Sequence, residues 1–297
     1  MRVIFGIKTK CQQWSQTMLW SCCLALGIFL INTNQTIQAQ SSLLQQSSEV
    51  GLWIGSGTYF GDLNPDYSLR QTLPAAGVLY RFDVNPYVAL RAGASFTRLQ
   101  HRDAISDNPY QLARNLSFRS NILEFSGNVE LHFMEYIIGD KKHFFTPYLT
   151  AGVGLFYFNP EAELNGEWYN LREVGTEGQN NSDYSGNEKY KQTYVAIPVG
   201  LGFKYWAAGA WNFYVEAAYR STFTDYLDDV STVYVDNFLL ADDPTTVALS
   251  DRSAETGINP IGVEGKQRGD TSSNDGYMLL NVGVTYTIFN RKCKKIH

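Results

Sequence analysis

Residues 121–134 read NILEFSGNVELHFM, and their alternation decides the fold. Apolar residues occupy every second position over most of the stretch, and polar or small residues lie between them. Successive side chains of a strand point to opposite faces, so the pattern predicts a β-strand with one apolar face and one polar face. A helix would distribute the same residues around its axis. The apolar face is formed by Leu123, Phe125, Val129, Leu131 and Phe133.

The same alternation recurs along the chain and predicts eight strands. Several of them reach 12 to 14 residues, whereas strands of soluble proteins usually have about 5–6 residues and a tilted strand crosses a bilayer with about 9–11. We therefore expect strands that span a membrane. The expected strands are Glu49–Phe60, Leu73–Phe82, Tyr87–Gln100, Asn121–Met134, Phe145–Phe158, Tyr194–Trp206, Trp211–Thr224 and Tyr277–Phe289.

The links between these strands alternate in length. The short links are 83–86, 135–144 and 207–210, and the long links are 61–72, 101–118, 159–193 and 225–276. Outer-membrane barrels have short periplasmic turns and long external loops, and closure leaves no unpaired strand edge in the hydrocarbon. The pattern predicts an all-β protein, an eight-stranded antiparallel transmembrane outer-membrane β-barrel with both termini periplasmic. A secreted β-sandwich or lipocalin-like barrel is the soluble alternative, because it also alternates.

The N-terminus has the features of an export signal. Basic residues at Arg2, Lys8 and Lys10 precede an apolar run of 14 residues, 18–31, which is shorter than the roughly 20 residues of a spanning helix. We expect residues 1–39 to be a cleaved signal peptide. A helical anchor and a lipoprotein site at Cys22 or Cys23 are the less favoured alternatives. The expected parts after it are a short periplasmic segment, 40–48, the barrel, 49–289, and a basic periplasmic tail, 290–297.

Cleavage of the signal would leave Cys293 as the remaining cysteine. An odd cysteine in an export compartment indicates a free thiol or a bond to another chain. The chain has 24 Lys and Arg residues against 29 Asp and Glu residues, a net charge of −5 that argues against a nucleic-acid partner. No apolar run of 18 residues follows the signal, which excludes helical membrane spans.

The polar strand faces predict what fills the barrel. The interior of an eight-stranded barrel is narrow and occupied by side chains, so an open pore is not expected. Charged residues on these faces would neutralise one another inside the lumen. The predicted lumenal network consists of Glu124, Glu130, His132, Lys204, Glu216 and Arg220.

Catalytic and metal-binding patterns are weak. Ser126, Glu130 and His132 share one strand face, but same-face neighbours lie about 7 Å apart, so a compact triad would need neighbouring strands. We expect no enzyme activity, no cofactor and no metal. Residues 225–275 carry eleven acidic residues against three basic ones, and 160–188 carry seven against one. Calcium binding is conceivable there but no EF-hand spacing is present, and solvated, partly mobile external loops are the commoner explanation.

Several short segments of the chain form a set with a characteristic order and spacing. They are Glu49-Val50-Gly51, Tyr59-Phe60-Gly61-Asp62-Leu63-Asn64, Phe145-Thr146-Pro147-Tyr148, 196–202, 216–220, 222–228, 273–277 and 285–289, followed by Arg291 and Lys292 with Cys293. Together these segments resemble one family, the PorG-like outer-membrane barrels of the type IX secretion system of Bacteroidota, and the region of Cys293 looks like that family's cysteine-bearing C-terminus. The chain departs from the family at Gly276, where an aromatic residue is frequent, and its tail is more basic.

The resemblance implies a non-enzymatic outer-membrane component that anchors a periplasmic ring, built from a PorK-like lipoprotein and a PorN-like partner, and that contributes to protein secretion and in some hosts to gliding. We expect Arg291, Lys292 and Cys293 to bind the ring, with Cys293 in a disulfide to a ring subunit, since a periplasmic odd cysteine needs a partner in another chain. The barrel itself would contact outer-membrane lipid. The competing hypothesis is a surface adhesin or ligand-binding barrel that acts through its acidic external loops.

Overall fold

A computed structural model describes residues 47–181, 188–240 and 243–289. The expected signal peptide and the basic tail with Arg291, Lys292 and Cys293 lie outside these residues. Of the expected periplasmic segment 40–48, residues 47 and 48 already belong to the first strand.

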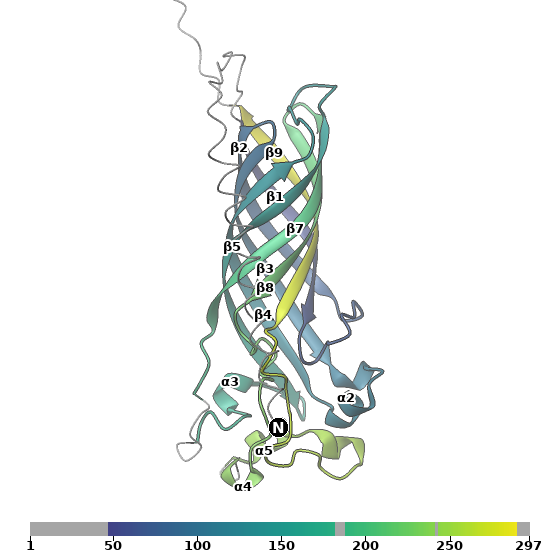
Figure 1. Ribbon diagram of the computed structural model, residues 1–297, viewed down its shortest axis with the longest axis vertical. Coiled ribbons are helices and arrows are strands. Elements are labelled where there is room, and N and C mark those ends of the chain that lie inside the picture. The colour runs from purple at the N-terminus through teal and green to yellow at the C-terminus, as the bar shows by residue number, and fades with distance from the viewer. Residues whose placement is uncertain (1–46, 182–187, 241–242, 290–297) are drawn as a thin grey trace, which may run out of the picture. The chain divides into compact units, whose positions relative to one another are not determined.

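Eight long strands close into one antiparallel barrel (Figure 1). Each strand pairs with its neighbour, and the pairs β1–β9 and β4–β5 complete the circle. The prediction of a closed eight-stranded antiparallel barrel is confirmed. Its strands are β1 Ser47–Phe60, β2 Leu73–Asn85, β3 Val88–Arg102, β4 Ser117–His132, β5 Phe145–Leu164, β7 Thr193–Ala208, β8 Trp211–Thr222 and β9 Gly276–Phe289.

Some strands continue beyond the expected bounds. Strand β5 runs to Leu164 and forms a hairpin with the short strand β6, Glu167–Asn170, in a region expected to be loop. Strand β4 begins at Ser117 rather than Asn121. In both extensions the outward residues are polar, such as Arg119 and Glu161, which hides the alternation that reveals the strands elsewhere.

The two ends of the barrel differ. The turn end carries the links 86–87, 133–144 and 209–210, and the pair Ser47 and Phe289 places the first and last described residues there. The loop end carries the links 61–72, 103–116, 165–192 and 223–275, and Figure 1 shows the helices gathered at this end. Among the described residues, no helix is long and apolar enough to cross a membrane. The helical segments are η1 Asp103–Ile105, α2 Pro109–Arg114, α3 Leu171–Val174, α4 Asn237–Leu240, α5 Pro244–Ser250 and η2 Ser253–Thr256.

The outward face of the barrel is apolar over most of its height. Leu52 and Ile54 of β1 expose 63% and 69% of their surface, and comparable side chains point outward from the other strands. A continuous exposed belt of this kind would be unfavourable in water but matches the hydrocarbon of a bilayer. Aromatic pairs such as Trp211 and Tyr286, whose ring centroids are 5.1 Å apart, lie toward the turn end. The surface is that of an outer-membrane barrel.

Candidate functional site

Charged side chains meet inside the barrel near the turn end. The guanidinium of Arg81, on β2, lies 3.0 Å from Glu49 of β1 and 2.8 Å from Glu130 of β4. The ammonium of Lys204, on β7, lies 2.6 Å from the other oxygen of Glu49 and 3.4 Å from Asp83. Arg81, Glu49, Glu130 and Lys204 are fully buried. Each charge therefore has an opposite charge beside it, as buried charges require.

A second pair connects opposite walls of the barrel. In the closed strand order, β3 and β8 are separated by β2, β1 and β9 on one side and by three strands on the other. Arg91 of β3 nevertheless lies 2.5 Å from Glu216 of β8, and a second nitrogen donates to the other carboxylate oxygen at 3.1 Å. The Tyr148 hydroxyl also donates to Glu216, at 2.9 Å. These contacts fill the cross-section.

A third group lies toward the loop end. The Tyr277 hydroxyl donates to Glu124 at 2.5 Å, again from the opposite wall, and Arg220 of β8 lies 3.2 Å from the same carboxylate. A cavity of about 30 Å³ lies beside this group, and that is room for about one or two waters. The described side chains pack closely in this part of the lumen and leave a gap of water size.

The structure places all six residues of the predicted lumenal network inside the barrel. It brings His132 Nε2 to 3.8 Å from Glu130 but does not complete a triad with Ser126. Ser126 accepts a hydrogen bond from Asn128, and His132 Nδ1 contacts the Pro86 carbonyl at 3.1 Å. Sequence reasoning missed other members of the network, among them Asp83. Glu49, Arg81 and Arg91 alternate with outward apolar residues such as Val50, Tyr80 and Leu90, and this signal was available in the sequence.

Aromatic rings close the lumen on the loop-end side of the charged residues. Phe158 stacks on Tyr190 with centroids 6.0 Å apart, and Tyr190 stacks on Tyr226 at 4.5 Å. Tyr59 meets Phe118 edge to face at 4.8 Å. These rings come from strands and from the two long acidic loops, so the loops pack on the barrel mouth.

Parts of the acidic loops form a buried cap, and the expectation that these loops are solvated is wrong for the acids described next. Asp228 and Asp275 both accept a hydrogen bond from the Tyr59 hydroxyl, at 2.5 and 2.8 Å, and each is 1% exposed. Asp229, fully buried, accepts from the hydroxyls of Tyr190 and Thr176. These acids are buried because side chains of strand β1 and of the other acidic loop donate hydrogen bonds to them, which the acidic composition of one loop does not reveal.

Burial also perturbs the acids of the cap. It raises the pKa of Asp225 to about 9, although a hydrogen bond from Ser231 acts in the other direction. It raises the pKa of Asp229 to about 6 despite the nearby Arg268 guanidinium. Arg268 in turn lies 2.9 Å from Glu177. The cap therefore combines carboxyl groups that favour the protonated form with one buried ion pair.

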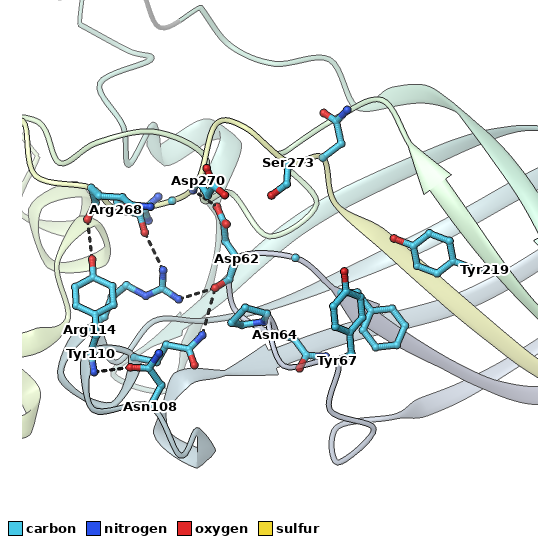
Figure 2. Close-up of a pocket in the computed structure, with 17 residues that line it drawn as sticks. Asp62, Asn64, Tyr67, Asn108, Tyr110, Arg114, Tyr219, Arg268, Asp270 and Ser273 are labelled. Atoms are coloured by element: carbon cyan, nitrogen blue, oxygen red, sulfur yellow. Dashed lines mark hydrogen bonds between the residues drawn. The ribbon is translucent and has the colours of Figure 1, made fainter. Parts of the chain in front are cut away.

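A pocket of about 400 Å³ opens beside the cap at the loop end (Figure 2). Asp62 lies near its centre, where its carboxylate accepts from the Asp270 amide at 2.8 Å and its carbonyl from Arg114 at 3.1 Å. Figure 2 shows Tyr67 and Tyr219 on one side of Asp62 and Tyr110 on the other. Polar groups and aromatic faces thus surround an accessible hollow.

One family model matches most of the chain. Residues 28–239 match the family described as a domain of unknown function, DUF6089. No curated protein matches the chain.

Three solved structures are similar in fold only. The N-terminal barrel domain of Pseudomonas aeruginosa OprF shares 12% identity, with 82% of this chain and 98% of that chain covered and a TM-score of 0.34. Yersinia pestis Ail, the attachment invasion locus protein, solved with a heparin analogue, shares 9% identity, with 82% of this chain and 100% of that chain covered and a TM-score of 0.38. Neisserial surface protein A shares 11% identity, with 80% of this chain and 96% of that chain covered and a TM-score of 0.40.

Proposed function

This chain belongs to the DUF6089 family, and from that premise we propose that it is a non-conducting, non-enzymatic outer-membrane anchor for the periplasmic ring of a type IX secretion system. The observation that carries the proposal is the filled lumen. Opposite walls are joined through Arg91 and Glu216 and through Tyr277 and Glu124. A barrel braced in this way suits a rigid attachment point better than a conduit.

The type IX assignment rests on the resemblance to PorG-like barrels, and the structure supplies one supporting relationship. Tyr59, Asp228 and Asp275 belong to three separate segments of that resemblance. They meet in a single buried hydrogen-bond group. The matching segments are therefore parts of one structural unit rather than scattered similarities.

The ring would bind at the turn end. Phe289, the last described residue, pairs with Ser47 at that end, and we propose that the turn end faces the periplasm and that the basic tail continues from it. Arg291, Lys292 and Cys293 would then face the periplasmic ring, and we propose that Cys293 forms a disulfide with a ring subunit, the PorK-like lipoprotein or its PorN-like partner.

A complementation experiment tests which end acts. In a host strain that lacks the protein, secretion of a cargo with a C-terminal sorting signal is measured after expressing variants at equal membrane levels. Exchange of Arg291 and Lys292 for Gln together with Cys293→Ser should abolish or strongly reduce secretion. The matched control, Tyr67→Ala with Tyr110→Ala at the loop end, should leave secretion at the wild-type level. The reverse result would exclude the anchor.

The loop-end pocket favours a second candidate, a surface adhesin or ligand-binding barrel. Its exposed Tyr67 and Tyr110 and its central Asp62 are suited to binding an extracellular ligand. This candidate predicts that the loop-end double variant abolishes binding of cells to a surface or host matrix while secretion continues. Unchanged adhesion would remove it.

A further inference from the structure

The outward side chains of β3, β4 and β5 change from apolar to polar between one row of paired residues and the next row toward the loop end. Phe96 pairs with Leu123 and Leu123 with Tyr157, which makes an apolar row across three strands. The next outward row toward the loop end contains the pair Arg98 and Asn121. Same-face neighbours on a strand are about 7 Å apart, so Arg98 lies where hydrocarbon gives way to lipid headgroups.

A groove of about 330 Å³ opens at this boundary on the outside of the barrel. Its wall toward the membrane is apolar, and its wall toward the loop end carries three arginines. Among the described residues that line the groove there is no Asp or Glu. The lining residues are Leu73, Pro74, Phe96, Arg98, Gln100, Arg102, Arg119 and Trp168.

Two of the three arginines are not neutralised by the protein. Within 47–181, 188–240 and 243–289, neither Arg98 nor Arg102 has a carboxylate within 4.0 Å, and both side chains are exposed. Arg98 donates only to the Asn121 amide oxygen, at 2.8 Å. Arg119 differs, because it pairs with Glu161 at 2.8 Å and its guanidinium lies 3.3 Å from the ring centre of Trp168.

The arginines and the apolar wall together indicate which kind of ligand the groove can bind. Guanidinium groups bind phosphate oxygens through paired hydrogen bonds, and exposed apolar side chains at this height face acyl chains. A lipid phosphate satisfies both walls at once, whereas a free phosphate satisfies only the arginines. An adjoining groove of about 180 Å³ shares Arg102 and Arg119 and is also lined by Glu163 and Arg252, so it offers polar partners for the sugar of the same lipid.

We propose that this groove binds a phosphorylated membrane glycolipid, with its phosphate on Arg98 and Arg102 and an acyl chain on Phe96. The site holds the barrel at a fixed depth and rotation in the leaflet that meets the loop end. It is independent of whether the turn end binds a secretion ring.

Native mass spectrometry of the purified protein in an uncharged detergent tests the site, with bisphosphorylated lipid A as the probe. The variant Arg98→Gln with Arg102→Gln should bind the probe at least about tenfold more weakly than wild type. Neither arginine has a carboxylate partner to leave unpaired, so the barrel should still fold. Heat-dependent mobility on a semi-native gel checks this point.

The matched control is Lys141→Gln with Lys142→Gln, which removes the same charge at the exposed link of the turn end. It should retain wild-type affinity. Lipid A stripped of phosphate should bind equally weakly to wild type and to the arginine variant. The proposal is overturned if the arginine variant binds the probe as wild type does, or if the lysine variant loses as much affinity. Displacement of the probe by millimolar inorganic phosphate would also overturn it, because the groove would then be a simple anion site.

Discussion

Arg91 and Glu216 form an ion pair across the full width of the barrel, with 2.5 Å between the guanidinium nitrogen and the carboxylate oxygen. Their strands lie on opposite walls, so the pair fixes the distance between walls that share no backbone hydrogen bonds. Glu216 is also held by Tyr148, and Arg91 also lies 3.1 Å from Glu130. The barrel is braced internally by a connected set of charges.

Breaking this pair should be costly because one charge would remain buried without its main partner. We expect Arg91→Met to lower the free energy of unfolding by about 3–5 kcal/mol. The double variant Arg91→Met with Glu216→Leu should lose much less. Urea titration in lipid vesicles, followed by tryptophan fluorescence, measures both. Equal losses in the single and double variants would show that the pair does not brace the barrel.

The packed lumen predicts the electrical behaviour of the protein. Reconstituted into planar bilayers, the wild type should give no stable conductance steps, because charged pairs and aromatic rings occupy successive levels of the interior. An open porin measured in parallel shows that the assay detects channels. Reproducible unitary steps from the wild type would contradict the filled lumen and, with it, the observation behind the proposed function.

Gly202 allows the Tyr148 ring to lie flat against the neighbouring strand. The two residues are paired between β7 and β5, and a Cβ at Gly202 would lie 2.2 Å from the ring. Gly202→Val should therefore lower the free energy of unfolding by about 1–3 kcal/mol through overpacking. It should also displace the Tyr148 hydroxyl from Glu216. Gly127→Val is the control, since nothing lies within 4 Å of the Cβ position there. Heat-dependent gel mobility distinguishes them, and equal behaviour would refute the close approach.

The loop-end cap should weaken as pH rises. Burial raises the pKa of Asp229 to about 6 and that of Asp225 to about 9, whereas an unfolded Asp titrates near about 3.9. The folded cap thus binds more protons than the unfolded cap, so this contribution is complete below about pH 4 and is lost as pH rises through about 6 and then about 9. Proteolysis of the loop 223–275 should accelerate accordingly.

The matching variant for this test is Asp225→Asn, which keeps the shape and remains neutral. It should reduce the alkaline part of the pH dependence, to which Asp228 and Asp275 also contribute because burial raises the pKa of both, and leave the part near pH 6. The protease's own pH dependence is measured on an unfolded substrate and divided out. A cap that resists cleavage equally from pH 5 to pH 9 would show that these carboxyl groups do not control its stability.

Strand alternation predicted the barrel because membrane strands must separate a lipid face from a lumenal face. The signal failed where strands leave the membrane, since the outward positions of β4 and β5 become polar at Arg119 and Glu161. The hairpin of β5 with β6 was missed for the same reason. The outward arginines of β3 carried no functional prediction, with Arg98 in an expected strand and Arg102 in the expected link 101–118. Their significance depends on the apolar row of paired residues that lies next to them toward the membrane.

The interior was predictable in part. Residues such as Glu124 and Lys204 stand out within apolar alternation, but which carboxylate meets which cation depends on barrel closure and on strand stagger. The cap was harder still. The contact of Tyr59 with Asp228 and Asp275 joins residues separated by 169 and 216 positions, and no local pattern in an acidic loop distinguishes a solvated carboxylate from one held by a distant tyrosine.

The most direct test of the anchor is to purify the tagged protein from gently solubilised outer membranes of its host without reductant. The proteins that migrate with it are then identified before and after addition of thiol. The account predicts a ring lipoprotein in a thiol-sensitive adduct that Cys293→Ser abolishes. Recovery of the barrel alone, together with normal secretion in a deletion strain, would contradict it.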